Sequence, residues 1–344
     1  MKILLTGHHG YIGSVCAQVV SAAGHEVVGL DTLFYRDCDL RAAPSLSTET
    51  LLTDVRDVRP EQLEGFDAVV HLAALSNDPI GDFSPELTRE INYEATVSLA
   101  RAAREAGVGR FVFSSSCSMY GTSSDQAVDE SAPLKPLTAY AESKVRSEEA
   151  LAELAGPDFS PVSMRNATAY GVSARLRVDL VLNNLVGWAY TTGKVKIMSD
   201  GTPWRPLIHV EDISRAALAA VEAPEDAVRG EAFNVGRDGE NYQVRELGDI
   251  VQAVVEGSEV EYAGSGDPDP RSYRVSFAKL QRTFPELRLT WTARAGAQEL
   301  VDAYRAAELS LQQFESDRFT RLKRLRLLLE RGDLDPTLRW RRAA

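Results

Sequence analysis

The sequence predicts an α/β fold with a doubly wound parallel sheet, together with a smaller α/β part. Three observations lead to this prediction: short apolar runs alternate with helical patterns, the first run enters a glycine-spaced loop, and a later run ends in hydroxyl residues. Short apolar runs without strict alternation are typical of strands buried on both faces, as in parallel sheets. The 344 residues are enough for one large domain or two.

The first predicted strand, residues 1–5, leads into the loop Thr6-Gly7-His8-His9-Gly10-Tyr11-Ile12-Gly13 and then into a helix over 14–23. Glycines at this spacing allow a tight turn, close approach of the backbone to a pyrophosphate, and close packing of helix on strand. The helix N-terminus presents free N–H groups to an anion. The loop therefore predicts a dinucleotide site.

The second predicted strand, residues 26–30, ends in Asp31. A carboxylate at this place accepts hydrogen bonds from a ribose diol and repels a 2′-phosphate, which favours NAD over NADP. Arg36 is close enough in sequence to leave NADP as an alternative.

The alternation continues with a strand over 68–74, a helix over 94–106 and a strand over 110–116 that ends in Ser114, Ser115 and Ser116. In an open parallel sheet, ligands bind outside the carboxyl ends of the strands. We therefore expect Ser116 to face the crevice that holds the dinucleotide.

Tyr140 and Lys144 begin the next predicted helix, and a four-residue step places them on one helical face. A free tyrosine loses its proton only near pH ~10, and a nearby cation favours the phenolate. Lys144 could supply that cation and make Tyr140 a base. The alternative is a surface helix with a packed ring and a solvated lysine.

These motifs resemble the extended short-chain dehydrogenase/reductases, and within them the nucleotide-sugar epimerases and dehydratases. The resemblance covers about residues 1–310. The matching pieces, in order, are the Thr-Gly-x-x-Gly-x-x-Gly loop, Asp31, Asp54-Val55, His71-Leu72-Ala73-Ala74, Asn92, Ser114-Ser115-Ser116, Tyr120-Gly121, Tyr140-x-x-x-Lys144, Asn183-Asn184-Leu185 and Trp204 to Asp212.

The resemblance implies a Rossmann fold, NAD as cofactor and a role for each matching residue. Tyr140 would take a proton from a sugar hydroxyl as hydride leaves, Ser116 would share that oxygen, and Lys144 would also hold the nicotinamide ribose. The implied cofactor-binding residues are Gly7, Gly10, Tyr11, Ile12, Gly13, Asp31, Asp54, Val55, Leu72, Ala73, Ala74, Asn92, Ser114, Tyr140 and Lys144.

The resemblance also implies a site for a nucleotide-diphosphate sugar. Its residues would be Ser116, Ser118, Asn184, Arg205 and Arg271. Arginine suits a diphosphate because its planar fork binds two phosphate oxygens. For Arg271 the alternative is an ion pair with Asp267 or Asp269.

Cys117 and Ser118 depart from the family pattern. Members that eliminate water from C6 of the sugar usually have Asp-Glu at these positions, so 4,6-dehydratase activity is disfavoured here, and so are the decarboxylases that use a glutamate nearby. Cys117 could be a second acid or base, since thiols titrate near ~8.5, or a small packed thiol.

The predicted function is therefore an NAD-dependent nucleotide-sugar epimerase, acting at C4 by transient oxidation to a keto-sugar and return of the hydride. The alternative is a keto-sugar reductase or dehydrogenase that exchanges NAD(P)H with solution. A protein that only senses dinucleotides would be expected to lose Tyr140 or Lys144, and both are present.

The predicted organisation is a dinucleotide-binding Rossmann domain over 1–165, a nucleotide-sugar part over 166–314 and a tail over 315–344. A net charge of −12 argues against nucleic-acid binding, and no apolar run approaches the ~20 residues of a membrane span. The three cysteines show no paired spacing and the five histidines show no metal-ligand pattern, so we expect a cytoplasmic protein without metal. Resemblance implies a homodimer through helices 94–106 and 140–154.

The tail reverses the acidic balance of the chain. Within the basic segment 318–342, residues 319–329 read as an amphipathic helix, and Trp340 follows it. Such a helix can lie on an anionic membrane or an acidic partner. The alternative is that Leu322, Leu325 and Leu329 dock on the body of the same chain or of its twin.

Overall fold

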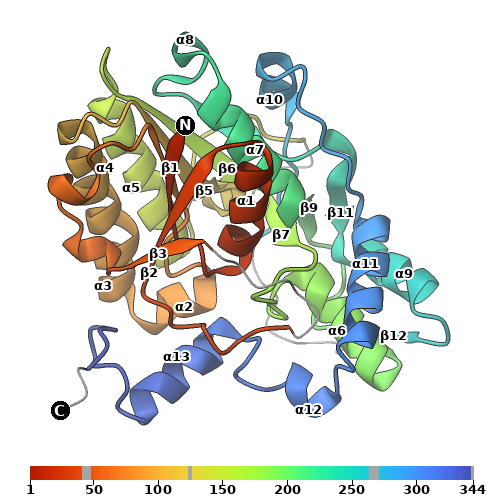
Figure 1. Ribbon diagram of the computed structural model, residues 1–344. Helices are drawn as coiled ribbons and strands as arrows, with labels where there is room; N and C mark the ends of the chain where they lie inside the picture. The colour runs from red at the N-terminus through yellow and green to blue at the C-terminus, as the bar shows by residue number, and fades with distance from the viewer. Residues whose placement is uncertain (41–47, 123–125, 263–270, 342–344) are drawn as a thin grey trace.

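The computed structural model describes residues 1–40, 48–122, 126–262 and 271–341 (Figure 1). It confirms the doubly wound parallel sheet, which has seven strands in the order β10-β6-β5-β4-β1-β2-β3. The strands are β1 (Lys2–Thr6), β2 (Glu26–Asp31), β3 (Glu49–Leu52), β4 (Ala68–His71), β5 (Arg110–Ser116), β6 (Ser160–Asn166) and β10 (Ala232–Val235). The order reverses beside β1, which pairs in parallel with both β2 and β4, and ligands bind at such a switch point.

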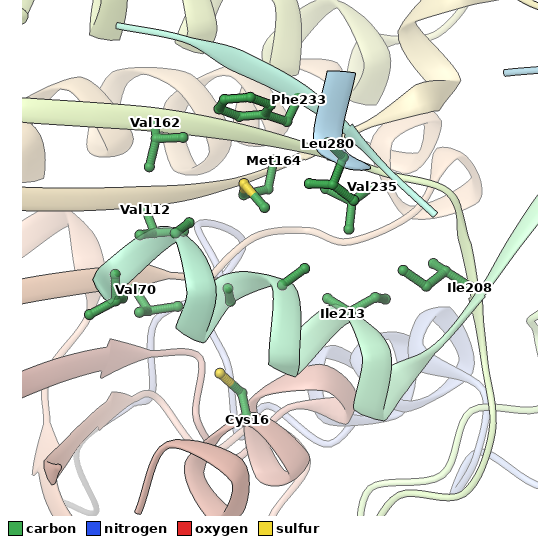
Figure 2. Packing of buried hydrophobic residues seen from close by; sticks show 14 of the residues in the cluster. Cys16, Val70, Val112, Val162, Met164, Ile208, Ile213, Phe233, Val235 and Leu280 are labelled. Atoms are coloured by element: carbon green, nitrogen blue, oxygen red, sulfur yellow. The ribbon is translucent and has the colours of Figure 1, made fainter. Parts of the chain in front are cut away.

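Alternate residues of the strands pack on opposite faces of this sheet, because side chains of a strand alternate between its two faces. Ile3 and Leu5 belong to the core shared with α1 (Tyr11–Ala22) and α7 (Val210–Glu222), and Figure 2 shows Cys16 and Ile213 of these helices in that core. Leu4 belongs to the other core, under α4 (Ala95–Glu105) and α5 (Ala139–Leu154).

The smaller part has its own core, against a sheet in the order β11-β9-β7. These strands are β7 (Thr168–Tyr170), β9 (Trp204–His209) and β11 (Asn241–Gln243), and a parallel pair is formed by β8 (Lys194–Ile197) and β12 (Glu259–Tyr262). The helices are α6 (Val181–Thr192), α9 (Val244–Val254) and α11 (Ala293–Ala306). Because β10 returns to the large sheet after β9, that sheet contains strands from both sides of residue 165, and the domain boundaries stay predictions.

Short helices connect these layers. They are α2 (Asp78–Phe83), α3 (Pro85–Thr88), the π-helical turn η3 (Arg89–Glu94), α8 (Glu225–Val228), α10 (Ala278–Thr283) and α12 (Leu311–Phe314). Over the residues that the structure describes, no helix has both the length and the apolar character needed to cross a membrane.

The tail docks on the body of its own chain. Its helix α13 (Arg321–Glu330) lies below α2 in Figure 1 and covers most of the predicted helix, and the chain turns at Gly332 with a φ of +72°. Leu325 and Leu328 are buried in the core under α4 and α5, and Leu322 and Leu329 pack against it. The structure thus agrees with docking on the same chain.

Candidate active site and dinucleotide cleft

A cleft opens at the carboxyl ends of β1, β2 and β4, with about 930 Å³ of empty volume that is partly open to solvent. Most of the predicted cofactor residues line it, namely Gly7, Gly10, Tyr11, Ile12, Gly13, Asp31, Asp54, Val55, Leu72, Ala73 and Ala74.

The glycine loop packs as tightly as its spacing predicts. Gly7 has a φ of +71°, and a Cβ there would lie 2.8 Å from the Ala73 nitrogen. A Cβ on Gly13 would lie 2.1 Å from the Gly7 carbonyl oxygen. No side chain caps the N-terminus of α1, so its first N–H groups are left for an anion at the cleft. This donor set fits the pyrophosphate of a dinucleotide.

Asp31 is fixed at the end of β2 by its neighbours. Its carboxylate accepts hydrogen bonds from the backbone N–H groups of His9, at 3.1 Å, and Leu33, at 2.7 Å. Burial raises the pKa of Asp31, and these two hydrogen bonds oppose the shift. A carboxylate has further lone pairs, so this group also fits a ribose diol.

The structure brings Ser116, Tyr140 and Lys144 together. Thr138 caps α5 by accepting a hydrogen bond from the Ala141 N–H at 3.1 Å, so both predicted side chains come from the first two turns. The Lys144 ammonium donates to the Ser114 carbonyl at 2.7 Å. The Ser116 side chain is close enough to the Tyr140 phenol to lower its pKa, and its hydroxyl donates to Ser118 at 3.0 Å.

Burial shifts both titrating groups toward their neutral forms. It raises the pKa of Tyr140 to about 12, with the Asp78 carboxylate adding to the rise and the Ser116 side chain opposing it. Burial lowers the pKa of Lys144 to about 7, and the Glu148 charge opposes this shift. The ligand-free site therefore keeps the proton on the phenol, and added positive charge would favour the phenolate.

Asp78 is a site residue that sequence reasoning missed. It begins α2, which Asn77 caps by accepting a hydrogen bond from the Ile80 N–H at 3.0 Å. Its carboxylate accepts the Thr138 hydroxyl at 2.5 Å and forms an ion pair with Arg271. The available signal was Asn-Asp-Pro, a helix start placed just after β4. Both Asp78 and Arg271 influence the pKa of Tyr140, so Arg271 lies near the catalytic group. Asp267 and Asp269, the alternative partners of Arg271, lie outside the described residues.

The predicted diphosphate ligands Asn184 and Arg205 come from the smaller part. Asn184 on α6 donates to the Val178 carbonyl at 2.8 Å. Arg205 on β9 donates to the Trp204 carbonyl at 2.8 Å and to that of Arg271, so the two predicted phosphate ligands are neighbours.

Asn92 has a supporting position beside the cleft. Its side chain bonds the backbone of Leu75 at 2.7 and 3.0 Å and donates to the Ser143 hydroxyl at 3.3 Å. It thereby links the loop after β4 to α5. The Ser114 hydroxyl accepts from Asn166 at 3.0 Å.

Cys117 points away from the crevice. Its thiol is fully buried and donates to the Arg165 carbonyl at 3.0 Å, and burial raises its pKa. The packed-thiol alternative therefore agrees with the structure, and an acid or base role does not.

Comparison with known proteins agrees with this geometry. Residues 3–236 match the model of the NAD dependent epimerase/dehydratase family, and the chain belongs to that family. It is 32% identical over 286 residues to a UDP-glucose 4-epimerase of Corynebacterium glutamicum, which covers 78% of this chain and 85% of that one. A UDP-glucose 4-epimerase of Bacillus subtilis is 28% identical over 343 residues, 92% of this chain and 99% of that one.

Solved structures confirm the fold and the cofactor class. The UDP-glucose 4-epimerase of Thermus thermophilus in complex with NAD matches with a TM-score of 0.75 and 26% identity, over 89% of this chain and 100% of that one. The dTDP-glucose 4,6-dehydratase DesIV of Streptomyces venezuelae, with NAD bound, matches with a TM-score of 0.76 and 26% identity, over 89% and 97%. NAD is the cofactor of this chain, as predicted. Since epimerases and dehydratases share the fold, the site residues must separate the two reactions.

Proposed function

We propose that the protein is an NAD-dependent nucleotide-sugar epimerase that acts at C4, with UDP-hexoses as the first substrates to test. The observation that supports this most is the grouping of Ser116, Tyr140 and Lys144. These residues do not line the cleft themselves, but Arg177, which lines it, lowers the pKa of Tyr140. Relatives described as UDP-glucose 4-epimerases match most of the chain and bear out the predicted epimerase class.

In this proposal the side chains of the protein transfer the proton. NAD, when bound, accepts a hydride from the sugar carbon and later returns it. Tyr140 takes the proton of the C4 hydroxyl as that carbon is oxidised, and gives it back when the ketone is reduced on its other face. Ser116, whose side chain lies near the phenol, orients the same oxygen. Lys144 supplies a nearby positive charge that favours the phenolate.

Arg205, Arg271 and Asn184 are proposed to bind the diphosphate of the substrate. Arg205 is largely buried, and its guanidinium donates to the backbone carbonyl of Arg271, so the two arginines are neighbours. Guanidinium forks suit a diphosphate, which carries several oxygens in a small volume.

Dehydration is not proposed, because the buried Cys117 thiol bonded to Arg165 replaces an elimination acid. The second candidate is a keto-sugar reductase that exchanges its cofactor with solution. The deciding experiment is to denature the purified protein, identify any released dinucleotide, and then supply UDP-glucose or UDP-galactose to fresh protein without added cofactor. Stoichiometric NAD and interconversion of the sugars are expected; an empty protein that exchanges with NADPH would favour the reductase.

We also propose a homodimer formed through α4 and α5, and a cytoplasmic location. The outer faces of these helices expose Arg101, Glu105, Arg146 and Glu149. The three cysteines are free and buried, which suits a reducing compartment. Analytical ultracentrifugation tests the dimer, and a monomer at micromolar concentration would contradict it.

A further inference from the structure

One wall of the dinucleotide cleft comes from the far end of the sequence. We call residues 319–341 the C-terminal strap. In Figure 1 the strap passes below the ends of β2 and β3 and below α2. Arg321, its first helical residue, lines the cleft together with the glycine loop and Asp31.

Arg321 has an unusual environment for an arginine on a basic tail. It is only 2% exposed. Its Nη2 donates to the Arg175 carbonyl at 2.7 Å, and its guanidinium carbon lies 4.1 Å from the centre of the Tyr35 ring. Its Nη1 is buried without a hydrogen-bond partner, and no carboxylate of the described chain pairs with it. A buried guanidinium with a free nitrogen is costly unless something compensates it.

The Asp179 carboxylate opposes the effect of burial on the pKa of Arg321, but this carboxylate is bound to other groups. Asp179 accepts two hydrogen bonds from Arg177, both at 3.0 Å, and a third from the Asn77 amide at 2.7 Å. Arg177 also lines the cleft, so Asp179 already balances one cleft cation. Arg321 therefore brings to the cleft wall a positive charge that has no ion-pair partner of its own among the described residues.

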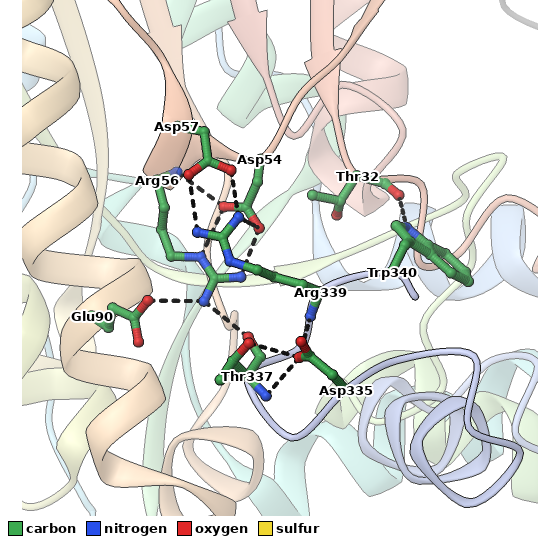
Figure 3. A network of polar contacts seen from close by, with 9 residues as sticks. All are labelled: Thr32, Asp54, Arg56, Asp57, Glu90, Asp335, Thr337, Arg339 and Trp340. Carbon is green, nitrogen blue, oxygen red and sulfur yellow. Dashed lines mark hydrogen bonds and ion pairs between the residues drawn. The ribbon is translucent and has the colours of Figure 1, made fainter. Parts of the chain in front are cut away.

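Ion pairs fasten the strap to the loop after β3 (Figure 3). Arg339 pairs with Asp57 and lies 3.8 Å from Asp54. Arg56 binds both oxygens of Asp54, at 2.9 and 2.7 Å, and donates to the Thr337 carbonyl at 2.9 Å. Asp54 in turn lines the cleft, so the strap is held by a residue of the dinucleotide site itself.

Aromatic and apolar contacts fasten it to the loop after β2. The Trp340 indole N–H donates to the Thr32 carbonyl, and its ring centre lies 5.9 Å from that of Phe34. Leu334 and Leu338 are buried in the same core as Val55. Thr32, Phe34 and Val55 line the cleft. Movement of the strap would thus disturb the wall of the cleft near Asp31 and Asp54.

We propose that the C-terminal strap is part of the NAD site, in which Arg321 binds the pyrophosphate and the strap slows release of the cofactor. The pyrophosphate is the anionic group of NAD, and a guanidinium with a free N–H is suited to it. The inference rests on the NAD dependence of the protein, and it is independent of which sugar reacts and at which carbon.

The test compares Arg321→Met with Arg326→Met, which removes the same charge from an exposed position of α13. Binding of NAD, ADP and adenosine to NAD-stripped protein is measured by calorimetry, with no sugar present, so the result does not depend on the proposed reaction. For Arg321→Met, NAD and ADP should bind about 10- to 100-fold more weakly, while adenosine binding and the control should stay within about twofold. Unchanged NAD binding, or an equal loss for adenosine, would overturn the assignment of Arg321.

Thermal unfolding separates a ligand role from a structural one. Without NAD, Arg321→Met should unfold at the wild-type midpoint or above it, and the rise in midpoint on adding NAD should shrink. A lower NAD-free midpoint with an undiminished rise would mean that Arg321 only supports the fold. If the Met variant does not fold, Arg321→Lys replaces it: a smaller loss confined to NAD and ADP supports the assignment, and any other pattern overturns it.

Arg339→Gln tests retention by the strap, because it removes the pair with Asp57 without touching Arg321. Labelled NAD is bound to each variant, and its dissociation is followed after dilution into a large excess of unlabelled NAD. Dissociation from Arg339→Gln should be at least about fivefold faster than from Arg326→Met. Equal rates in these two variants would overturn the proposed role of the strap.

Discussion

The Nζ atom of Lys144 lies 5.6 Å from the centre of the Tyr140 ring and 4.6 Å from that of Phe113. The ammonium donates to the Ser114 carbonyl at 2.7 Å. Glu148, whose charge opposes the fall in the pKa of Lys144, is already bound by Arg165 at 2.7 Å. Lys144 is therefore a buried amine whose positive charge has little compensation in the ligand-free protein.

Tyr140→Phe should reduce turnover by a factor of about 10² to 10⁴, because it removes the group that takes the sugar proton. Only one hydroxyl is lost, so the fold and the NAD content should be unchanged. Steady-state rates and released NAD are measured beside Tyr262→Phe, an exposed tyrosine outside the site. A Tyr140→Phe enzyme with more than a few per cent of wild-type turnover would remove this residue from the base role.

Lys144→Met should abolish turnover and also change how the stability of the NAD-free protein depends on pH. The folded-state pKa of Lys144 is about 7, below the ordinary lysine value of 10.5. As pH falls from about 10 to about 7, the unfolded chain binds this proton and the folded chain does not, so wild-type stability declines over that window. Urea unfolding should show a smaller decline for the variant, and parallel curves would contradict the assigned pKa.

The residues that sequence analysis identified belong to contiguous motifs with a local physical reason. The role of the Gly7–Gly13 loop follows from backbone sterics, and the pairing of Tyr140 with Lys144 follows from the helical step. Both features could therefore be predicted without knowledge of the fold. Asp78 and Arg321 could not, because their roles come from contacts with Arg271 and Arg175, which are distant in sequence. An arginine among many on a basic tail gives no local sign that it will be buried.

Asp31→Asn should weaken NAD more than NADP. The amide oxygen can replace only one of the two carboxylate oxygens that accept from the His9 and Leu33 N–H groups, and the negative charge that repels a 2′-phosphate is lost. We expect the ratio of the two dissociation constants to shift toward NADP by about tenfold, which is about 1.4 kcal/mol. Titration of NAD-stripped protein with each dinucleotide measures it. A wild-type ratio would show that Asp31 does not set the cofactor preference.

Asp78→Asn should shift the rising limb of the pH–rate profile to lower pH. The Asp78 charge raises the pKa of Tyr140, and Arg271 lowers it. Neutralising Asp78 removes the charge that raises the pKa of Tyr140 and breaks the ion pair between Asp78 and Arg271. Both changes favour the phenolate. The amide can still accept the Thr138 hydroxyl, which keeps the cap of α5.

Where proton removal limits the rate, turnover of Asp78→Asn at pH 7 should rise several-fold, and Arg271→Gln should shift the profile the opposite way. Asp82→Asn, exposed on the same helix, is the control. A profile of Asp78→Asn that coincides with this control would show that Asp78 does not tune Tyr140.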